Sequence, residues 1–442
     1  MPLDQAVIQL LERAEFSQHI VKGARVSYNR AESARHVAYV CFTRRYETSL
    51  AAQSTETLLD LYLRALLKGT SRHPSSDALT RAFRGVRVEQ SALFTDRNQD
   101  LLTMGLPLKF SSMDAVAQIF DVVDEMLSNP RAATDGSVFE NVRKEHLDSI
   151  EDRIGNHDAR ASTLFFRKFF PQSAALEDED EKTIVKEATF HSLQRIAKEH
   201  LSGSAVTLLY SGHADLSDIV EQFLSRVTVY GHGTEALPAP EVEWLPKVTG
   251  PVHECGPSQQ MQFIRAYPLE DALRHPEDWA ALKLVNQLLG GSGWTSPLMQ
   301  IIREKHHLVY GIRSLYLPKK NVIFISTSHE PAVYTKIVEL MDGIVADIAE
   351  GSFSDDAFGK AKAQLLEEHL VSYGHGLSTC DQPDFRVNNA YNQFVRRAVD
   401  LSRLESYRIL AAVQPSDARH AAQRFLDPMR SQIFTYSKSG NP

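Results

Sequence analysis

The sequence predicts an α/β (α+β) protein made of two homologous domains, and three observations support this prediction. With 442 residues, the chain is long for a single hydrophobic core. Strand-like stretches and amphipathic helical stretches alternate along it. Several short strings also recur in the same order about 220 residues apart, which is close to one domain length.

The first half alternates strands and helices. Two strand-like runs lie within residues 23–46, and HVAYVCF at 36–42 is the clearer of them. The pattern at 54–68 is apolar on most of a helix surface, so we expect this helix to be buried on several sides and to end at Gly69. The other predicted elements of this half are a helix from residue 74, strands within 91–108, helices at 113–127, 137–154 and 189–201, and a buried strand at 205–212.

A segment rich in chain breakers separates the two halves. Residues 229–250 contain YGHG and LPAP, which favour neither helix nor strand, so we predict an inter-domain linker there. The predicted domains are therefore residues 1–228 and 251–442.

The second half repeats features of the first. FGKAK at 358–362 resembles FENVR at 139–143, and a helix followed by IFTYS at 433–437 resembles an earlier helix followed by TLLYS at 207–211. Any two α/β domains can share such short strings. Their common order along the chain nevertheless favours duplication.

Composition excludes several function classes. A formal net charge of -8, with acidic and basic residues interspersed, argues against nucleic-acid binding and against a polybasic membrane anchor. No apolar run has the length of a membrane span, and acidic residues near the N-terminus argue against a secretory signal. The cysteines Cys41, Cys255 and Cys380 are far apart and odd in number, which suits a reducing compartment. We expect a cytoplasmic protein without nucleic-acid or membrane partners.

The stretch 280–310 organises the second half. A predicted helix ends at the glycine pair 290–291. Ser296 is placed to cap a second, short helix, which turns its apolar side chains inward and ends near Arg303. A strand that carries Tyr310 follows. The pattern can therefore bring a guanidinium and a phenol to one surface.

Five strings in this order and spacing resemble one peptidase family. LKGT at 67–70 and HPSS at 73–76 are similar to the segment after its zinc helix, and LLGG at 288–291, SPL at 296–298 and the run from REK to LVY at 303–310 are similar to the signature of its second half. The family is the insulinase and mitochondrial-processing-peptidase superfamily of zinc metallopeptidases, whose motif is the inverted H-x-x-E-H. The resemblance covers nearly the whole chain. It implies a bacterial two-domain subunit with a metallopeptidase-like duplication, in which each domain is an antiparallel-rich mixed sheet with helices packed on one face.

The zinc helix of the family, at 55–68 in this chain, departs from the family pattern. Asp60 and Arg64 stand at the positions of the two His ligands, and Leu63 stands at the position of the general-base Glu. Two His four residues apart supply two of the three protein ligands that a catalytic zinc needs. Arg64 cannot deprotonate to bind a metal, and Leu63 cannot take a proton from water. The resemblance thus implies a degenerate motif without zinc in this chain.

Carboxylates remain in the region that would supply a third zinc ligand. Without the two His, we expect Glu145, Glu151 and Asp152 to lie on a solvated helix. Three other groups are expected at the surface and not in a metal site: HH at 306–307, EEH at 367–369 and the acidic run EDEDE at 177–181, which we expect to be a solvated loop.

Members of the family also use an Arg and a Tyr seven residues apart, and these positions match Arg303 and Tyr310. A guanidinium can donate hydrogen bonds to substrate carbonyl oxygens, and a phenol can donate to the oxyanion that forms when water attacks. Alternatively, Arg303 pairs with a neighbouring acid and Tyr310 is half-buried core. His307 departs from the pattern, because a glycine is common just before the Leu-x-Tyr of this turn.

A glycine-rich loop of the family is matched in short form by Gly290, Gly291 and Gly293. Its exposed backbone would bind an extended substrate peptide. The alternative is that these glycines only form a helix cap and a tight turn.

The resemblance implies a function in a complex. Some heterodimers of the family pair a zinc-bearing subunit with a partner that has lost the motif. We expect such a partner here: a chain that is no enzyme by itself and supplies Arg303 and Tyr310 in trans to the zinc of a homologous subunit, for the processing of leader or precursor peptides. Two alternatives stay open, namely an inert pseudo-peptidase that acts as a scaffold or regulatory peptide-binding protein, and an active enzyme with an unusual metal site.

Overall fold

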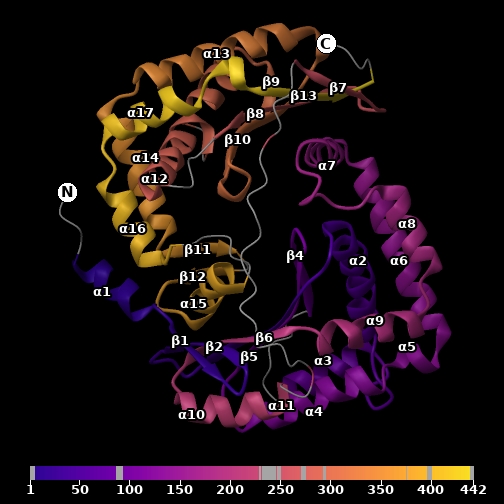
Figure 1. Cartoon of the computed structure of the whole chain (residues 1–442). Helices are drawn as coiled ribbons and strands as arrows, with labels where there is room; N and C mark the ends of the chain where they lie inside the picture. The colour runs from indigo at the N-terminus through magenta and orange to yellow at the C-terminus, as the bar shows by residue number, and fades with distance from the viewer. Residues whose placement is uncertain are drawn as a thin grey trace.

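The chain folds into two halves, each with its own β-sheet and its own helices (Figure 1). The computed structural model describes residues 5–85, 93–227, 230, 245, 250–269, 275–291, 295–374, 376–395 and 401–438. In Figure 1 the first half runs from indigo to magenta and the second from orange to yellow. Among the described helices, none is long and apolar enough to cross a membrane.

The sheet of the first half has the strand order β1-β2-β6-β3-β5-β4. The β2–β6 pair is parallel, and the other neighbours are antiparallel. The strands are β1 (Ser17–Val21), β2 (Ala24–Arg30), β3 (His36–Arg45), β4 (Phe94–Asn98), β5 (Leu101–Phe110) and β6 (Ala205–Gly212). The helices are α1 (Gln5–Arg13), α2 (Ser49–Leu66), α3 (Ser76–Gly85), α4 (Ala115–Ser128), α5 (Arg131–Thr134), α6 (Gly136–Gly155), α7 (His157–Phe169), α8 (Asp178–Glu187), α9 (Phe190–Ser202), α10 (Leu216–Ile219), the π-helix η1 (Val220–Leu224) and α11 (Ser225–Val227).

The sheet of the second half has the order β7-β13-β8-β10-β9, with the β7–β13 pair parallel. Its strands are β7 (Val252–Cys255), β8 (Met261–Pro268), β9 (Val309–Leu317), β10 (Val322–His329) and β13 (Gln432–Ser437), beside a separate hairpin of β11 (Val371–Gly374) and β12 (Gly376–Thr379). The longer helices are α12 (Pro276–Asn286), the π-helices η3 (Gln287–Gly291), η4 (Leu298–Lys305) and η7 (Tyr391–Val395), and α13 (Tyr334–Glu350), α14 (Asp355–Glu368), α15 (Pro383–Ala390), α16 (Arg403–Ala412) and α17 (Pro415–Phe425). Single 3-10 turns occur at η5 (Pro318–Lys320), η6 (Pro331–Val333) and η8 (Pro428–Arg430).

The two sheets correspond strand by strand. The order β7-β13-β8-β10-β9 repeats the order β2-β6-β3-β5-β4, and the parallel pair stands at the same place in both. The helix before the last strand also corresponds, since α17 leads into β13 as α9 leads into β6. The predicted fold class, two homologous domains with antiparallel-rich mixed sheets, is thus confirmed. The domain limits stay a prediction, because most of the linker 229–250 lies outside the described residues.

Each sheet buries one face under its own helices. In β3, Ala38 and Val40 face the core of the first half, whereas Val37 and Cys41, on either side of this pair, belong to a different cluster on the opposite face. This alternation is the two-residue period of a strand. In the second half, Ile325 of β10 lies in the corresponding core with side chains of α12 and α13. The prediction of helices packed on one face is therefore correct for both sheets.

The opposite face of each sheet receives a helix from the other half. Helix α7 packs on β8 and β13, where Phe165 contacts Phe434 with ring centroids 5.9 Å apart. Helix α15 packs on β3 and β6, where Arg386 Nη1 donates to Asn29 Oδ1 over 2.9 Å and Tyr391 of η7 joins the buried cluster. Figure 1 shows these two reciprocal contacts at opposite sides of the molecule. Helix α1 also packs on α16 of the second half, where Leu11 lies in one buried cluster with Leu404, so several contacts hold the two halves together.

The prediction for the acidic run 177–181 is wrong. These residues form the first turn of α8 and not a solvated loop. Negative side chains favour this position because a helix N-terminus carries partial positive charge. Asp178 and Glu181 are also buried, and both pair with Arg153.

The short helix after Ser296 has the predicted position but a different geometry. Ser296 Oγ accepts a hydrogen bond from Met299 N over 3.4 Å, as expected of a cap. The residues that follow form the π-helix η4, in which His306 N donates to Ile301 O. Periodicity over two turns cannot separate an α-helix from a π-helix, and single π-turns occur often at functional sites.

Candidate functional site: a degenerate zinc helix and an exposed Arg–Tyr pair

Helix α2 presents Asp60 and Arg64 together on its outer side. Thr48 caps the helix by accepting from Ala51 N, and apolar side chains bury the opposite side in the first core. Arg64 Nε donates to Asp60 Oδ2 over 2.7 Å. At the two positions that the resemblance matches to the His ligands of the family, this chain has an ion pair.

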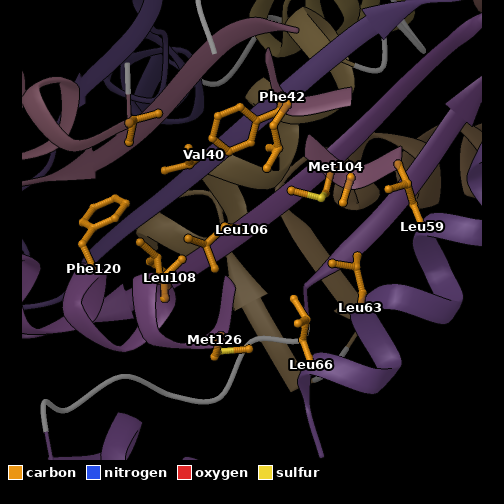
Figure 2. Packing of buried hydrophobic residues seen from close by; sticks show 14 of the residues in the cluster. Val40, Phe42, Leu59, Leu63, Leu66, Met104, Leu106, Leu108, Phe120 and Met126 are labelled. Carbon is orange, nitrogen blue, oxygen red and sulfur yellow. The ribbon is translucent and has the colours of Figure 1, made fainter. Parts of the chain in front are cut away.

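Leu63 lies on a different side of α2, inside the core. It is 2% exposed and lines a small apolar hollow of about 30 Å³, together with side chains such as Val40, Leu66 and Met104. Figure 2 shows these residues converging between α2 and the first sheet. A general base must contact water and accept a proton from it. Leu63 can do neither, and its surroundings would disfavour a carboxylate.

Helix α6 supplies the neighbours of the ion pair. His146 is buried, with Nδ1 3.7 Å from Asp60 Oδ2 and Nε2 3.5 Å from Glu181 Oε1. Glu181 is paired in turn with Arg153. The burial of Glu181 and its contacts with His146 and Arg153 oppose each other, and the pKa of this carboxyl is lowered because the contacts prevail. The residues form a charge network that connects α2, α6 and α8.

These donors do not fit a catalytic zinc. The Arg64 guanidinium already neutralises Asp60 and would repel a dication. Glu145 binds Lys68 over 2.8 Å, and Glu151 binds Lys182 over 2.7 Å. In the described part of the chain, no three His, Cys, Asp or Glu side chains are grouped so that they could hold a metal. That the chain functions without its own zinc stays a prediction, and the donor set favours it.

Arg303 and Tyr310 are brought together in the second half. The Arg303 guanidinium carbon lies 5.4 Å from the centre of the Tyr310 ring, within the range of a cation–π contact. Arg303 Nη1 also lies 3.6 Å from Glu304 Oε1. Tyr310 is 89% exposed, so the alternative of a half-buried core tyrosine is wrong. The catalytic role of the two residues stays a prediction.

A β-bulge explains the exposure of Tyr310. Thr327 pairs with Ile312 and His329 pairs with Val309, so Tyr310 and Gly311 together face one residue of β10. A bulge adds a residue to one strand and redirects its side chains. Thr327 Oγ1 donates to Gly311 O over 2.7 Å and so satisfies the carbonyl of the bulge. Sequence reasoning missed Thr327, although an isolated glycine in a strand pattern is a known signal of a bulge.

The backbone conformation at His307, where the sequence departs from the family pattern, is one that favours glycine. His307 has a φ of 53° and ends η4, with its N–H donating to Arg303 O over 2.9 Å. Glycine adopts this left-handed conformation without steric cost, whereas a residue with Cβ does not. A glycine is thus the natural residue at this turn, and His307 occupies it with some strain. The expected surface position of His306 and His307 agrees with their partial and full exposure.

The glycines at the end of α12 are packed closely. A Cβ on Gly290 would lie 2.7 Å from Leu298 Cδ1, and one on Gly291 would lie 2.8 Å from Asn286 Nδ2. A larger residue at either position would have to displace these neighbouring side chains. Gly293 lies outside the described residues. A role of these glycines in peptide binding stays a prediction.

The prediction of a surface position for EEH at 367–369 is wrong for His369, which is buried. His369 is 4% exposed, and its Nδ1 contacts Leu365 O over 2.9 Å. Burial lowers the pKa of His369 to about 3, with Lys283 and Arg403 contributing. A neutral buried imidazole without neighbouring ligands has no role in metal binding here.

The fold resembles solved structures along almost its whole length. A conserved protein from Enterococcus faecalis V583 superposes with a TM-score of 0.78 and 15% identity, covering 97% of this chain and 100% of that one. A peptidase M16 inactive domain from Pseudomonas fluorescens superposes with a TM-score of 0.72 and 17% identity, covering 96% and 98%. A protease from Helicobacter pylori does so with a TM-score of 0.69 and 14% identity, covering 96% and 99%. No curated protein matches the sequence.

The duplicated fold and the degenerate helix define a two-domain, peptidase-like chain. Residues 187–365 match the family model described as peptidase M16 inactive domain, and this stretch contains the glycine pair, Arg303 and Tyr310. The resemblance to the insulinase and mitochondrial-processing-peptidase family is thus confirmed. The chain therefore has a peptidase M16-like fold, and its residues 187–365 are similar to the peptidase M16 inactive domain.

Proposed function

We propose that this chain is the non-catalytic subunit of a heterodimeric zinc metalloendopeptidase. A homologous partner would bind the zinc, and this chain would complete the peptide-binding chamber. The observation that supports the proposal is the Arg303–Tyr310 pair beside β9, the outermost strand of the second sheet. A phenol that is 89% exposed is accessible to another chain.

The chemistry of the pair suits peptide hydrolysis at a metal held elsewhere. An extended peptide can add to the free edge of β9 by main-chain hydrogen bonds. The guanidinium of Arg303 can then donate to a peptide carbonyl, and the Tyr310 hydroxyl can donate to the oxyanion that forms after attack by water. The partner would have to activate that water, because Leu63 cannot act as a base and Arg64 cannot bind zinc.

The test is a reconstitution with a separately purified homologous subunit that has an intact H-x-x-E-H motif. Cleavage of a quenched fluorescent peptide is measured for each chain and for the mixture. We expect the mixture to exceed the sum of the two, and Arg303→Ala with Tyr310→Phe to lower its kcat about 100-fold, as loss of an oxyanion donor does.

A second Arg–Tyr contact gives a matched control. Arg44 lies over the Tyr46 ring at 5.2 Å in the first half. Arg44→Ala removes a similar contact away from β9, and we expect the mixture to keep its activity per folded molecule. The proposal fails if the partner is equally active alone, or if the Arg303 and Tyr310 substitutions have no more effect than Arg44→Ala.

A second candidate is an inert scaffold or regulatory peptide-binding protein. The free edge of β9 supports it, since strand addition needs only backbone groups. Under this alternative, the chain binds its partner and peptide, but the Arg303 and Tyr310 substitutions leave cleavage unchanged. Leader or precursor peptides as substrates and a bacterial cytoplasm as the location belong to the first proposal. The three free cysteines are compatible with that reducing compartment.

A further inference from the structure

Arg313 of β9 lies on the same face as Tyr310. Val309 and Ile312 are both buried in the helix-covered core of the second half. In a regular strand, residues three apart point to opposite faces. Here the extra residue of the bulge at Tyr310 and Gly311 places Val309 and Ile312 on the same face. Exposed Tyr310 and Arg313 therefore both lie on the face opposite the core of the second half. Helix α7 covers the β8 and β13 part of this face, and we call its exposed part at Tyr310 and Arg313 the open face.

The Arg313 guanidinium is held in one orientation. Its Nε donates to Ser326 Oγ on β10 over 3.2 Å. Among the described residues, its two terminal nitrogens make no hydrogen bond or ion pair. A guanidinium fixed at Nε presents these nitrogens as a fork, which matches a carboxylate.

The charge around Tyr310 is opposite to that of the whole protein. The chain has a formal net charge of -8. Residues 303–313 nevertheless contain the cations Arg303, Lys305 and Arg313 and one acid, Glu304. A peptide that pairs with β9 would therefore lie in a locally positive field.

We propose that the open face at β9 selects extended peptides that carry an Asp or Glu side chain, and that Arg313 is the residue that recognises this carboxylate. The inference rests on the proposed function, because it assigns the substrate class of the same edge. Tyr310 and Arg303 act at the scissile bond, whereas Arg313 contacts a side chain a few residues away along the strand.

Peptide binding to the full chain alone tests the inference. Fluorescence anisotropy is measured with labelled, C-terminally amidated peptides that differ by Glu, Gln or Lys at one central position. We expect the Glu peptide to bind about fivefold more tightly than the Gln peptide at low salt, as for a partly exposed ion pair. The difference should shrink at about 0.5 M salt because the charges are screened.

Variants assign the preference to Arg313. Arg313→Gln should remove the preference for Glu and leave the affinity for the Gln peptide unchanged, and Arg313→Lys should keep part of it. Arg81→Gln, on the exposed side of α3, is the matched control and should keep the full preference.

Three results would overturn the inference: equal affinity for the Glu and Gln peptides, a preference that survives Arg313→Gln, or a preference that depends only on a free C-terminal carboxylate. Failure of the proposed function appears differently. In that case the mixture with the zinc-bearing subunit gains no activity, while the charge preference in binding can still be measured.

Discussion

The two halves share one sheet order but treat their candidate site residues in opposite ways. In the first half, Arg64 and Asp60 satisfy each other at 2.7 Å, and Leu63 is enclosed in the core. In the second half, a bulge turns Tyr310 out to 89% exposure, with Arg303 beside it. The comparison shows that the candidate site residues of the first half are paired or buried, whereas Tyr310 of the second half is exposed.

Placing a carboxylate at position 63 should lower the stability of the fold more than any change at β9. Leu63→Glu places a carboxylate in an apolar hollow without a partner, so we expect the free energy of unfolding to fall by about 4 kcal/mol. Urea denaturation followed by circular dichroism measures this. Leu63→Met, which keeps the volume, should cost less than about 1.5 kcal/mol. A stable Leu63→Glu variant would show that the α2 position remains open to solvent.

Acid should weaken the packing of the first half around two buried histidines. Burial lowers the pKa of His36 to about 4, with His213 adding to the effect, and burial also lowers the pKa of His200 to about 4. These groups are neutral in the folded chain, and in the unfolded chain they bind protons below pH 6.5. Their contribution is present above pH 6.5 and is lost as the pH falls toward 4.

The expected loss is about 2 kcal/mol for each of these histidines between pH 7 and pH 5. Urea midpoints at the two pH values measure it, and His200→Gln should make the slope shallower. The same replacement at the exposed His191 is the control. A pH-independent midpoint would contradict the assignment of buried, neutral imidazoles.

The strain at the turn before β9 should be relieved by glycine. His307→Gly allows the φ of 53° without steric cost, and we expect a gain of about 0.5–1 kcal/mol in stability, reduced by the greater freedom of glycine in the unfolded chain. Thermal unfolding measures the gain. His306→Gly, one residue earlier in the right-handed region, should destabilise. Equal effects of the two substitutions would contradict the assignment of backbone strain to His307.

Breaking the ion pair on α2 should have the smallest effect. Arg64→Ala removes a partly exposed pair between residues four apart, which is worth about 0.3–0.5 kcal/mol. Its cost should fall further at high salt. A loss above about 2 kcal/mol would show that Arg64 also stabilises the network through His146, and the contrast with Leu63 would then be weaker.

Much of the fold could be predicted because the local signals agree. The alternation of β3 and the apolar surface of α2 are visible in the sequence, and the order of the recurring strings indicated the duplication. Helix α7 was missed, although its buried residues Ala161, Phe165 and Phe169 recur every four positions. That these side chains pack on the sheet of the other half is decided only by the tertiary structure. The π-geometry of η4 was missed because two turns do not define a period.

The sequence by itself determined which chemistry this chain lacks and which residue types it keeps. Arg64 cannot bind zinc and Leu63 cannot act as a base in any fold, because these are properties of the side chains. Whether Tyr310 is buried or exposed depended on the pairing of β9 with β10, where one extra residue in the bulge sets the face of every side chain around it. The common face of Tyr310 and Arg313 was likewise decided by the tertiary structure, since strand register is a property of two strands and not of one.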